Sequence, residues 1–108
     1  MGDSQGVAAL PVTFADIEAA HMAIMPHIIR TPCLKSRTLS DIVGAEVWLK
    51  FENLQFTVAY KERGALNTLL SLTDAQRKKG VIAASAGNHA QGIAYHGTRL
   101  GVPTTIVM

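Results

Sequence analysis

The chain has 108 residues, 48% of them hydrophobic and 17% charged, a composition that suits one globular domain and excludes a disordered segment. Its formal net charge of +2 is spread over ten basic residues with no run longer than Arg77-Lys78-Lys79, so nucleic acid is not an expected partner. No apolar stretch is long enough for a membrane span, and the first nine residues lack the features of a secretory leader. The single cysteine, Cys33, excludes an internal disulfide, so we expect a cytoplasmic protein with Cys33 buried or half-buried.

The first expected helix begins at Phe14, where Thr13 can cap it and Asp16 suits its first turn. Pro26 is expected to end or bend this helix. The residue before a proline avoids the helical region, so residues 30–34 are expected to be extended.

A short helix is expected over Ser40–Val43, stopped at Gly44. Residues 46–52 then alternate apolar and polar side chains, the pattern of a half-buried strand, with Trp48 as a packing residue. The apolar spacing over Tyr60–Leu72 predicts an amphipathic helix.

Four elements are expected in the last third of the chain: a short helical piece from Thr73 with a solvated basic end, a strand over 81–84, a helix over 88–100, and a strand over 104–107. Strands and helices therefore alternate, which predicts an α/β fold with a parallel sheet. The strand over 81–84 is expected to be buried on both faces. Because the last strand would leave an exposed sheet edge at Met108, we expect a longer chain of which these residues form an incomplete sheet.

Lys61 is the first residue that could carry chemistry. It follows a loop of small residues and starts a helix, where the positive end of the helix dipole disfavours an ammonium. Arg63 would act in the same direction if it came close, while Glu62 could offset it. A neutral amine is what Schiff-base chemistry with a carbonyl requires. Taken alone, Lys61 fits an ordinary surface lysine at a charged helix start better than a Schiff-base lysine.

The second candidate is the segment Ser85-Ala86-Gly87-Asn88-His89, between a buried strand and a helix start. Free backbone N–H groups and the helix dipole converge there, at the carboxyl end of the sheet, so the segment is a candidate anion site. Ser85 and Asn88 can add side-chain hydrogen bonds. A simple capped strand-to-helix turn is the alternative interpretation.

Metal binding is not expected. His89 and His96 could share one helix face, but two histidines without carboxylates or thiols at suitable spacing make a poor metal site. His21 and His27 are expected to be helix-surface or packing residues, and Tyr95 a packing residue.

Two longer motifs combine these signals: KFENLQFTVAYKERGALN (50–67) and SAGNHAQGIA (85–94). In this order and spacing they resemble fold-type II pyridoxal-phosphate (PLP) enzymes, and RTPCLKS (30–36) and GVPTTIVM (101–108) fit as well. The resemblance is to the amino-terminal part of the threonine/serine dehydratase (ammonia-lyase) family. It implies a fold similar to the tryptophan synthase β subunit, with residues 1–52 in a larger domain and 53–108 in a smaller α/β domain.

The resemblance also implies roles for single residues. Lys61 would carry PLP in a Schiff base, Tyr60 would lie beside the cofactor, and Asn88 would hydrogen-bond its ring hydroxyl oxygen. The segment Ser85–His89, which is Ser85, Ala86, Gly87, Asn88 and His89, would hold the substrate carboxylate. The implied reaction converts L-threonine or L-serine into a 2-oxo acid and ammonia, in amino-acid metabolism that includes isoleucine biosynthesis, and the full-length enzyme would be a homo-oligomer.

Two departures from the family pattern affect these expectations. Val58 and Ala59 stand where the family usually has glycine and serine, so backbone freedom and a hydroxyl near Lys61 are lost. No glycine cluster for the cofactor phosphate is present, so we expect these 108 residues alone to bind PLP weakly and to be inactive. Threonine synthase, a serine racemase and a non-catalytic α/β module remain alternatives, although Ala86 lacks the hydroxyl expected of a racemase.

Overall fold

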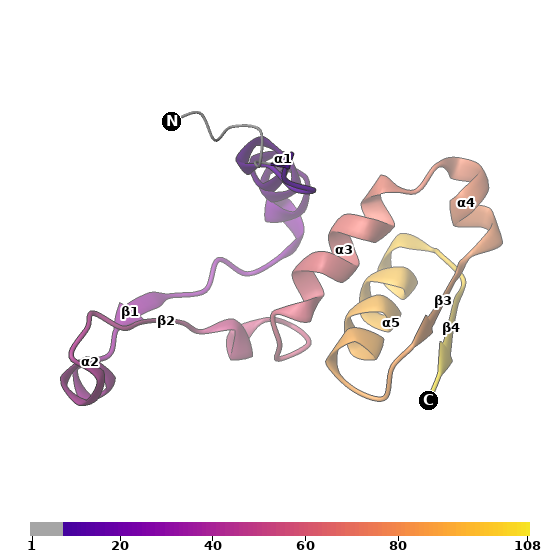
Figure 1. The fold of residues 1–108 in the computed structure, drawn as a ribbon. Helices are drawn as coiled ribbons and strands as arrows, with labels where there is room; N and C mark the ends of the chain where they lie inside the picture. Colours follow the sequence, from indigo (N-terminus) through magenta and orange to yellow (C-terminus); the bar gives the residue numbers. More distant parts are fainter. Residues whose placement is uncertain (1–7) are drawn as a thin grey trace.

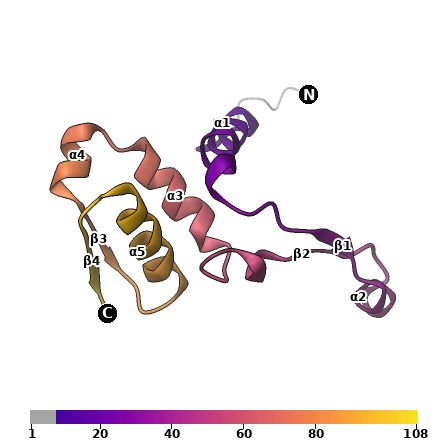
Figure 2. The same cartoon turned by 180° about the vertical axis from the view of Figure 1, so that it is seen from behind.

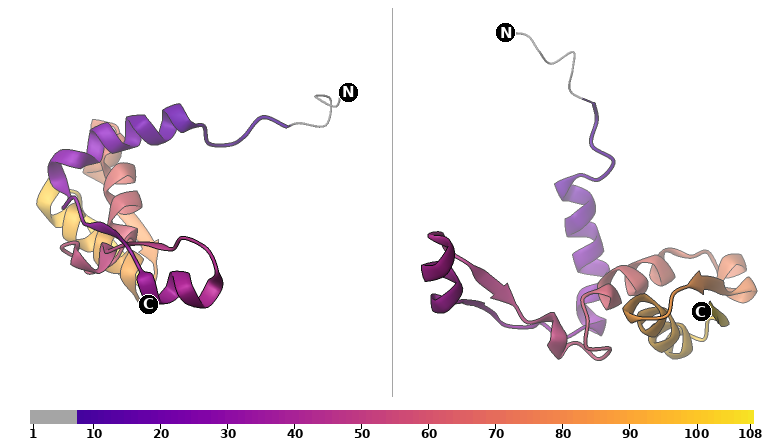
Figure 3. Two further views of the ribbon diagram at one scale, coloured as in Figure 1. Left: turned by 90° about the vertical axis from the view of Figure 1, so that its left-hand side faces the viewer. Right: turned by 60° about the horizontal axis from the view of Figure 1, so that its bottom comes forward.

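The structure is a computed structural model that describes residues 8–108. Its elements in chain order are α1 (Phe14–Ile24), the 3-10 helix η2 (Met25–His27), β1 (Cys33–Lys35), α2 (Arg37–Val43), β2 (Trp48–Lys50), the 3-10 helix η3 (Glu52–Leu54), α3 (Lys61–Ser71), α4 (Asp74–Lys79), β3 (Val81–Ala84), α5 (Asn88–Leu100) and β4 (Thr104–Val107) (Figure 1). The Cα radius of gyration is 17.8 Å, whereas a compact domain of this length has about 13 Å. Figure 2 and Figure 3 show the reason, since α1 and the β1–β2 pair with α2 extend away from a layered body.

Helix α1 begins and ends where the sequence predicts. Thr13 Oγ1 accepts a hydrogen bond from the Asp16 N–H at 3.2 Å, and Asp16 Oδ2 accepts one from the Thr13 N–H at 2.8 Å, which forms a capping box. The helix ends at Ile24, and Pro26 lies in the 3-10 helix that follows. None of the described helices is long and apolar enough to cross a membrane.

Helix α2 begins earlier than Ser40, at Arg37, because the Ser36 hydroxyl caps it by accepting from the Leu39 N–H at 3.2 Å. It ends at Gly44 as predicted. Gly44 has φ +70°, a left-handed conformation that glycine adopts without steric cost.

The strand predicted over 46–52 is shorter and lies in a different sheet from the later strands. β2 pairs with β1 in an antiparallel ribbon, with Cys33 opposite Lys50 and Lys35 opposite Trp48. Both strands are exposed, and Trp48 is 57% exposed, because no other element in the described part of the chain covers the ribbon. The expectations of a half-buried strand, of a packing role for Trp48 and of a buried Cys33 are therefore wrong here.

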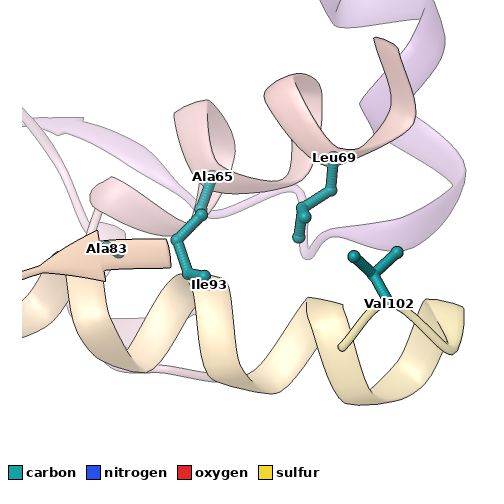
Figure 4. Close-up of a cluster of buried hydrophobic side chains, with 5 residues drawn as sticks. All are labelled: Ala65, Leu69, Ala83, Ile93 and Val102. Atoms are coloured by element: carbon teal, nitrogen blue, oxygen red, sulfur yellow. The ribbon is translucent and has the colours of Figure 1, made fainter. Parts of the chain in front are cut away.

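The layered body confirms the α/β class. β3 and β4 are parallel, with Val81 opposite Thr104 and Ala84 opposite Val107, and α5 connects them. Helix α5 packs on this sheet with one side and on α3 with the other (Figure 1). The core between these layers consists of Ala65, Leu69, Ala83, Ile93 and Val102 (Figure 4).

Only one face of the β3–β4 sheet is covered by the described residues. Ala83 is buried, whereas its neighbour Ile82, which points to the other face, is 77% exposed. The expectation that this strand is buried on both faces is therefore not met within residues 8–108. An apolar, uncovered face of a parallel sheet is what an incomplete sheet presents.

Helix α4 begins at Asp74, where Thr73 and Gln76 form a second capping box. Its basic end is not wholly solvated, because Arg77 is half-buried and its Nη2 donates to the carbonyl oxygen of Leu70 at 3.2 Å. Arg77 thus satisfies a carbonyl at the end of α3, which the sequence interpretation missed.

Candidate active site

Lys61 is the first residue of α3, and Tyr60 is the residue that precedes the helix. Both side chains are exposed, and the Lys61 Nζ atom lies 5.4 Å from the centroid of the Tyr60 ring. An ammonium at that distance is attracted by the face of the ring. The predicted place of the lysine at a helix start, next to an aromatic side chain, is confirmed.

A cavity of about 480 Å³ brings the lysine together with the second predicted motif. Its lining residues are Tyr60, Lys61, Arg63, Gly64, Ala65, Thr68 and His89. Of the segment Ser85–His89, only His89 reaches this cavity. A volume of a few hundred Å³ suits a small-molecule ligand.

Residues 85–87 form the turn between β3 and α5, and Asn88 and His89 begin the helix, as predicted. The Ser85 hydroxyl oxygen accepts hydrogen bonds from the N–H groups of Gly87 and Ala90, at 3.2 and 3.3 Å. It therefore caps the start of α5, which Gly87 cannot do because it has no side chain. A serine hydroxyl has two acceptor lone pairs and one donor, so its proton stays available to an anion. Asn88 and His89 are exposed in the first turn of α5.

The loop before Lys61 carries backbone strain at one of the two positions that depart from the family pattern. Val58 has φ +62°, the left-handed region that β-branched residues avoid. The turn is closed by the Val58 N–H, which donates to the Gln55 carbonyl at 2.9 Å. Ala59 is buried, and so is the hydroxyl of Thr57, which has no hydrogen-bond partner among the described residues. The structure thus requires at position 58 the conformation that glycine adopts freely.

Two hydrogen bonds tie this loop to the extended segment after η2. The Gln55 side-chain amide donates to the Ile29 carbonyl at 2.8 Å and accepts from the Ile29 N–H at 3.0 Å. Gln55 is buried, so both bonds are shielded from water.

Arg63 does not stand beside Lys61 as an unbalanced charge. It donates to Glu52 from Nε at 2.7 Å and from Nη2 at 2.9 Å, and the Thr31 hydroxyl donates to the same carboxylate at 2.6 Å. The hydrogen bonds from Arg63 hold the pKa of Glu52 at about 2, below its usual 4.5, although burial acts in the opposite direction. The same contact raises the pKa of Arg63. The sequence analysis expected Glu62 to offset the charge of Arg63. The structure corrects this, because Glu52 is the paired carboxylate.

Glu62 instead points into the interface between α3 and α5. Its Oε1 atom lies 3.0 Å from Nε2 of His96, and both side chains are 0% exposed. Burial raises the pKa of Glu62, opposed by the backbone N–H groups of Thr57 and Phe56. Burial, followed by the charges of Arg99 and His27, lowers the pKa of His96 to about 4. Sequence reasoning missed this pair, because no pattern connects residues so far apart.

The remaining histidines and Tyr95 lie as follows. His89 is exposed and His96 is buried, so they do not share an open helix face, and no group of three potential ligand side chains occurs among residues 8–108. His27 Nδ1 lies 3.2 Å from Arg99 Nη1, and His21 is exposed, as predicted for helix-surface residues. Tyr95 stacks on Phe56 with ring centroids 5.6 Å apart but is 40% exposed, so the predicted packing role holds for one face of its ring only.

Another cavity, of about 500 Å³, lies away from Lys61. It is lined by His21, Met25, Ile28, Arg30, Lys50 and Arg63. Neither Lys61 nor any residue of the Ser85–His89 segment lines it, so it is not the candidate active site.

A family model described as "Pyridoxal-phosphate dependent enzyme" matches residues 24–108. The chain belongs to this family. The predicted resemblance and the predicted cofactor class are confirmed, because the match spans both motifs and the enzymes of the family depend on PLP.

Relatives of this chain include a catabolic L-threonine dehydratase of Staphylococcus aureus strain USA300, 54% identical over 98 residues, which are 90% of this chain and 28% of that protein. Among solved structures, a threonine deaminase from T.th. is 44% identical with a TM-score of 0.76, covering 90% of this chain and 34% of that one. A serine racemase from Dictyostelium discoideum is 39% identical with a TM-score of 0.82, covering 89% and 32%. The chain thus spans about 28% of the length of the curated relatives it matches.

The residues of this family member fit the aldehyde end of PLP. The amine of Lys61 is accessible, the Tyr60 ring lies beside it, and both line a cavity of ligand size. A primary amine is the group that condenses with an aldehyde. Nine glycines are spread singly along the chain, so no glycine-rich loop here would hold the phosphate.

Proposed function

We propose that this chain supplies the cofactor lysine and the substrate-carboxylate segment of a PLP-dependent L-threonine/L-serine dehydratase. The reaction would release ammonia and a 2-oxo acid. The observation that carries the proposal is the shared cavity of Lys61 and His89, because it joins the two motifs that carry the resemblance. The percentage of identity to threonine dehydratases supports the same activity.

Each residue of the candidate site would have a separate task. Lys61 would bear the cofactor, and its amine is the base placed to take the α-proton. PLP, when bound, supplies an electron sink for the charge left on the substrate. Tyr60 would lie against the cofactor, and Asn88 would hydrogen-bond its ring hydroxyl oxygen.

The carboxylate of the substrate would bind at the start of α5. The Ser85 hydroxyl has a proton left to donate, and the N–H groups of Asn88 and His89 lie in the first helical turn. Gly87 and Ala86 present no bulky side chain, so an anion can approach the backbone.

Serine racemisation is the second candidate, because serine racemases are among the similar structures. A racemase must return a proton to the opposite face of the substrate. Ala86 carries no hydroxyl for this step, which supports the dehydratase. The curated relative is named catabolic, which supports a catabolic role over isoleucine biosynthesis.

Homo-oligomerisation, a cytoplasmic location, and the assignment of residues 1–52 and 53–108 to a larger and a smaller domain stay predictions. Small amino acids are the proposed substrates. Neither nucleic acid nor a membrane is a proposed partner.

The experiment is a chimera in which this chain replaces its aligned stretch in the staphylococcal dehydratase. With PLP and L-threonine, we expect 2-oxobutyrate and ammonia in equal amounts, and with L-serine we expect pyruvate. The matched Lys61→Ala chimera should form neither product. A chimera that converts L-serine to D-serine without 2-oxo acid would establish the racemase instead, and equal activity of the Lys61→Ala chimera would refute both.

A further inference from the structure

The contact between Glu62 and His96 is the only ion-pair geometry among residues 8–108 in which both side chains are fully buried. It connects the first turn of α3 to the middle of α5. Buried polar groups lower stability unless they are paired, and removing Glu62 leaves the buried Nε2 atom of His96 without its partner. The pair therefore allows α3 little freedom to rotate about its axis.

The direction of the hydrogen bond follows from the surrounding groups. Arg99 Nε donates to His96 Nδ1 at 3.3 Å, so Nδ1 is the unprotonated nitrogen of the ring. The proton is then on Nε2, which donates to Glu62 Oε1 at 3.0 Å. Arg99 also contacts His27 Nδ1 at 3.2 Å, which holds the guanidinium in place from the surface side. The chain of donors runs from Arg99 through His96 to Glu62.

Gly92 of α5 allows the backbones of α3 and α5 to approach closely at the same point. A Cβ atom at Gly92 would lie 3.3 Å from Cα of Glu62 and 3.1 Å from Cβ of Ala65. His96 follows Gly92 by one helical turn and so lies on the same face of α5. The packing of Ala65 against Ile93 continues this contact (Figure 4).

The direction of Glu62 determines the direction of Lys61. Successive residues of an α-helix point about 100° apart, so with Glu62 turned into α5 its neighbour is turned out of that interface. At the edge of the interface, Lys61 lines the cavity together with His89 of α5, whereas Glu62 does not line it.

We propose that Glu62, held by His96, is a positioning residue that keeps the amine of Lys61 in the cavity shared with His89. Glu62 would act through the rotation of α3 and would not touch cofactor or substrate. The inference rests on the proposed function only in taking Lys61 as the cofactor lysine.

The experiment measures which lysine condenses with PLP. The protein is incubated with PLP, reduced with borohydride, digested, and the share of label on Lys61 is compared with that on Lys78 and Lys79 by mass spectrometry. Both reference lysines are exposed at the end of α4. We expect Glu62→Leu to lower the Lys61 share roughly fivefold, because the Lys61 side chain would then divide its time between the cavity and other directions. Glu62→Gln, whose amide oxygen still accepts from His96, should stay within about twofold of the parent.

Leu69→Ala is the control for loosened packing, because Leu69 is fully buried on α3 and makes no polar contact. At a loss of stability equal to that of Glu62→Leu, Leu69→Ala should leave the Lys61 share of the label unchanged. An unchanged share in Glu62→Leu, or an equal loss in Leu69→Ala, would overturn the proposal. If Glu62→Leu does not fold, the same labelling is measured in Arg99→Gln. This exposed substitution removes the donor to Nδ1 of His96. A reduced Lys61 share then supports the proposal, and an unchanged share refutes it. Parent protein without preference for Lys61 would instead refute the proposed function.

Discussion

Arg63 and Glu52 form a bidentate ion pair, with Nε–Oε2 at 2.7 Å and Nη2–Oε1 at 2.9 Å. The pair joins α3 to η3, the 3-10 helix that precedes the loop before Lys61. Because Arg63 also lines the cavity of Lys61, the pair balances a positive charge next to the amine. The position of the lysine loop and the charge of the cavity thus depend on the same contact.

We predict that stability falls in acid through Glu52. Its pKa in the folded protein is about 2 and its usual value is 4.5, so the stabilisation is present above pH 4.5 and is lost as the pH falls toward 2. Glu52→Gln should lower the free energy of unfolding at neutral pH by about 1.5–3 kcal/mol, as for hydrogen bonds to charged groups. Urea denaturation followed by far-ultraviolet circular dichroism across this pH range is the measurement.

The matched control for Glu52 is Glu46→Gln. Glu46 pairs with Lys35 at 2.7 Å, but both side chains are exposed. Its removal should change the free energy of unfolding by about 0–1 kcal/mol. Equal effects of the two substitutions would contradict the assignment.

Val58→Gly is predicted to stabilise the protein. Val58 has φ +62° and its side chain is exposed, so glycine would relieve strain and lose little packing. Left-handed backbone costs non-glycine residues roughly 1–2 kcal/mol, and the greater freedom of unfolded glycine offsets about half of this gain. A thermal or urea unfolding series measures the effect. Ala59→Gly is the adjacent control, and it should destabilise, because Ala59 is buried and has no positive φ.

Ser85→Ala is predicted to destabilise the start of α5. The hydroxyl accepts from the N–H groups of Gly87 and Ala90, and both lose their partner when it is removed. The loss should be about 0.5–2 kcal/mol in the free energy of unfolding, the range for helix caps. Hydrogen exchange at the Ala90 amide reports the change locally, and unchanged protection there would refute the capping role. Ala86→Ser, next in the chain, is the control that should leave this amide unaffected.

The phosphate of PLP is predicted to add little to binding by these 108 residues. The chain has no glycine cluster to hold it, so 5'-deoxypyridoxal, which lacks the phosphate and cannot close into a hemiacetal, should label Lys61 at a rate within about twofold of PLP. Labelling rates are measured by borohydride reduction at equal concentrations. A tenfold preference for PLP would show a phosphate site that the sequence interpretation does not predict.

Local signals predicted most of the fold. The cap at Thr13 and the stop at Gly44 placed helix ends correctly, because the hydrogen bonds that form them lie within a few residues. The sequence could not show that Trp48 and Ile82 are exposed. Their apolar character predicts burial, and burial depends on which other elements cover them.

The candidate site was predictable to the same extent. Lys61 and the Ser85–His89 segment were predicted from motifs, and of that segment only His89 lines the cavity of Lys61. The pairing of Glu62 with His96 was not predictable, because the two residues are 34 positions apart and neither residue type by itself indicates burial. Close packing at Gly92 creates the contact, and only a structure shows this.

Reductive trapping shows whether Lys61 is the lysine that bears PLP. The protein is reduced with borohydride in the presence of PLP and its peptides are mapped, with Lys61→Arg as the matched control. We expect label to be concentrated on the peptide that contains Lys61 and to be lost in Lys61→Arg. Label distributed evenly over Lys35, Lys50, Lys78 and Lys79, and unaffected by Lys61→Arg, would contradict it.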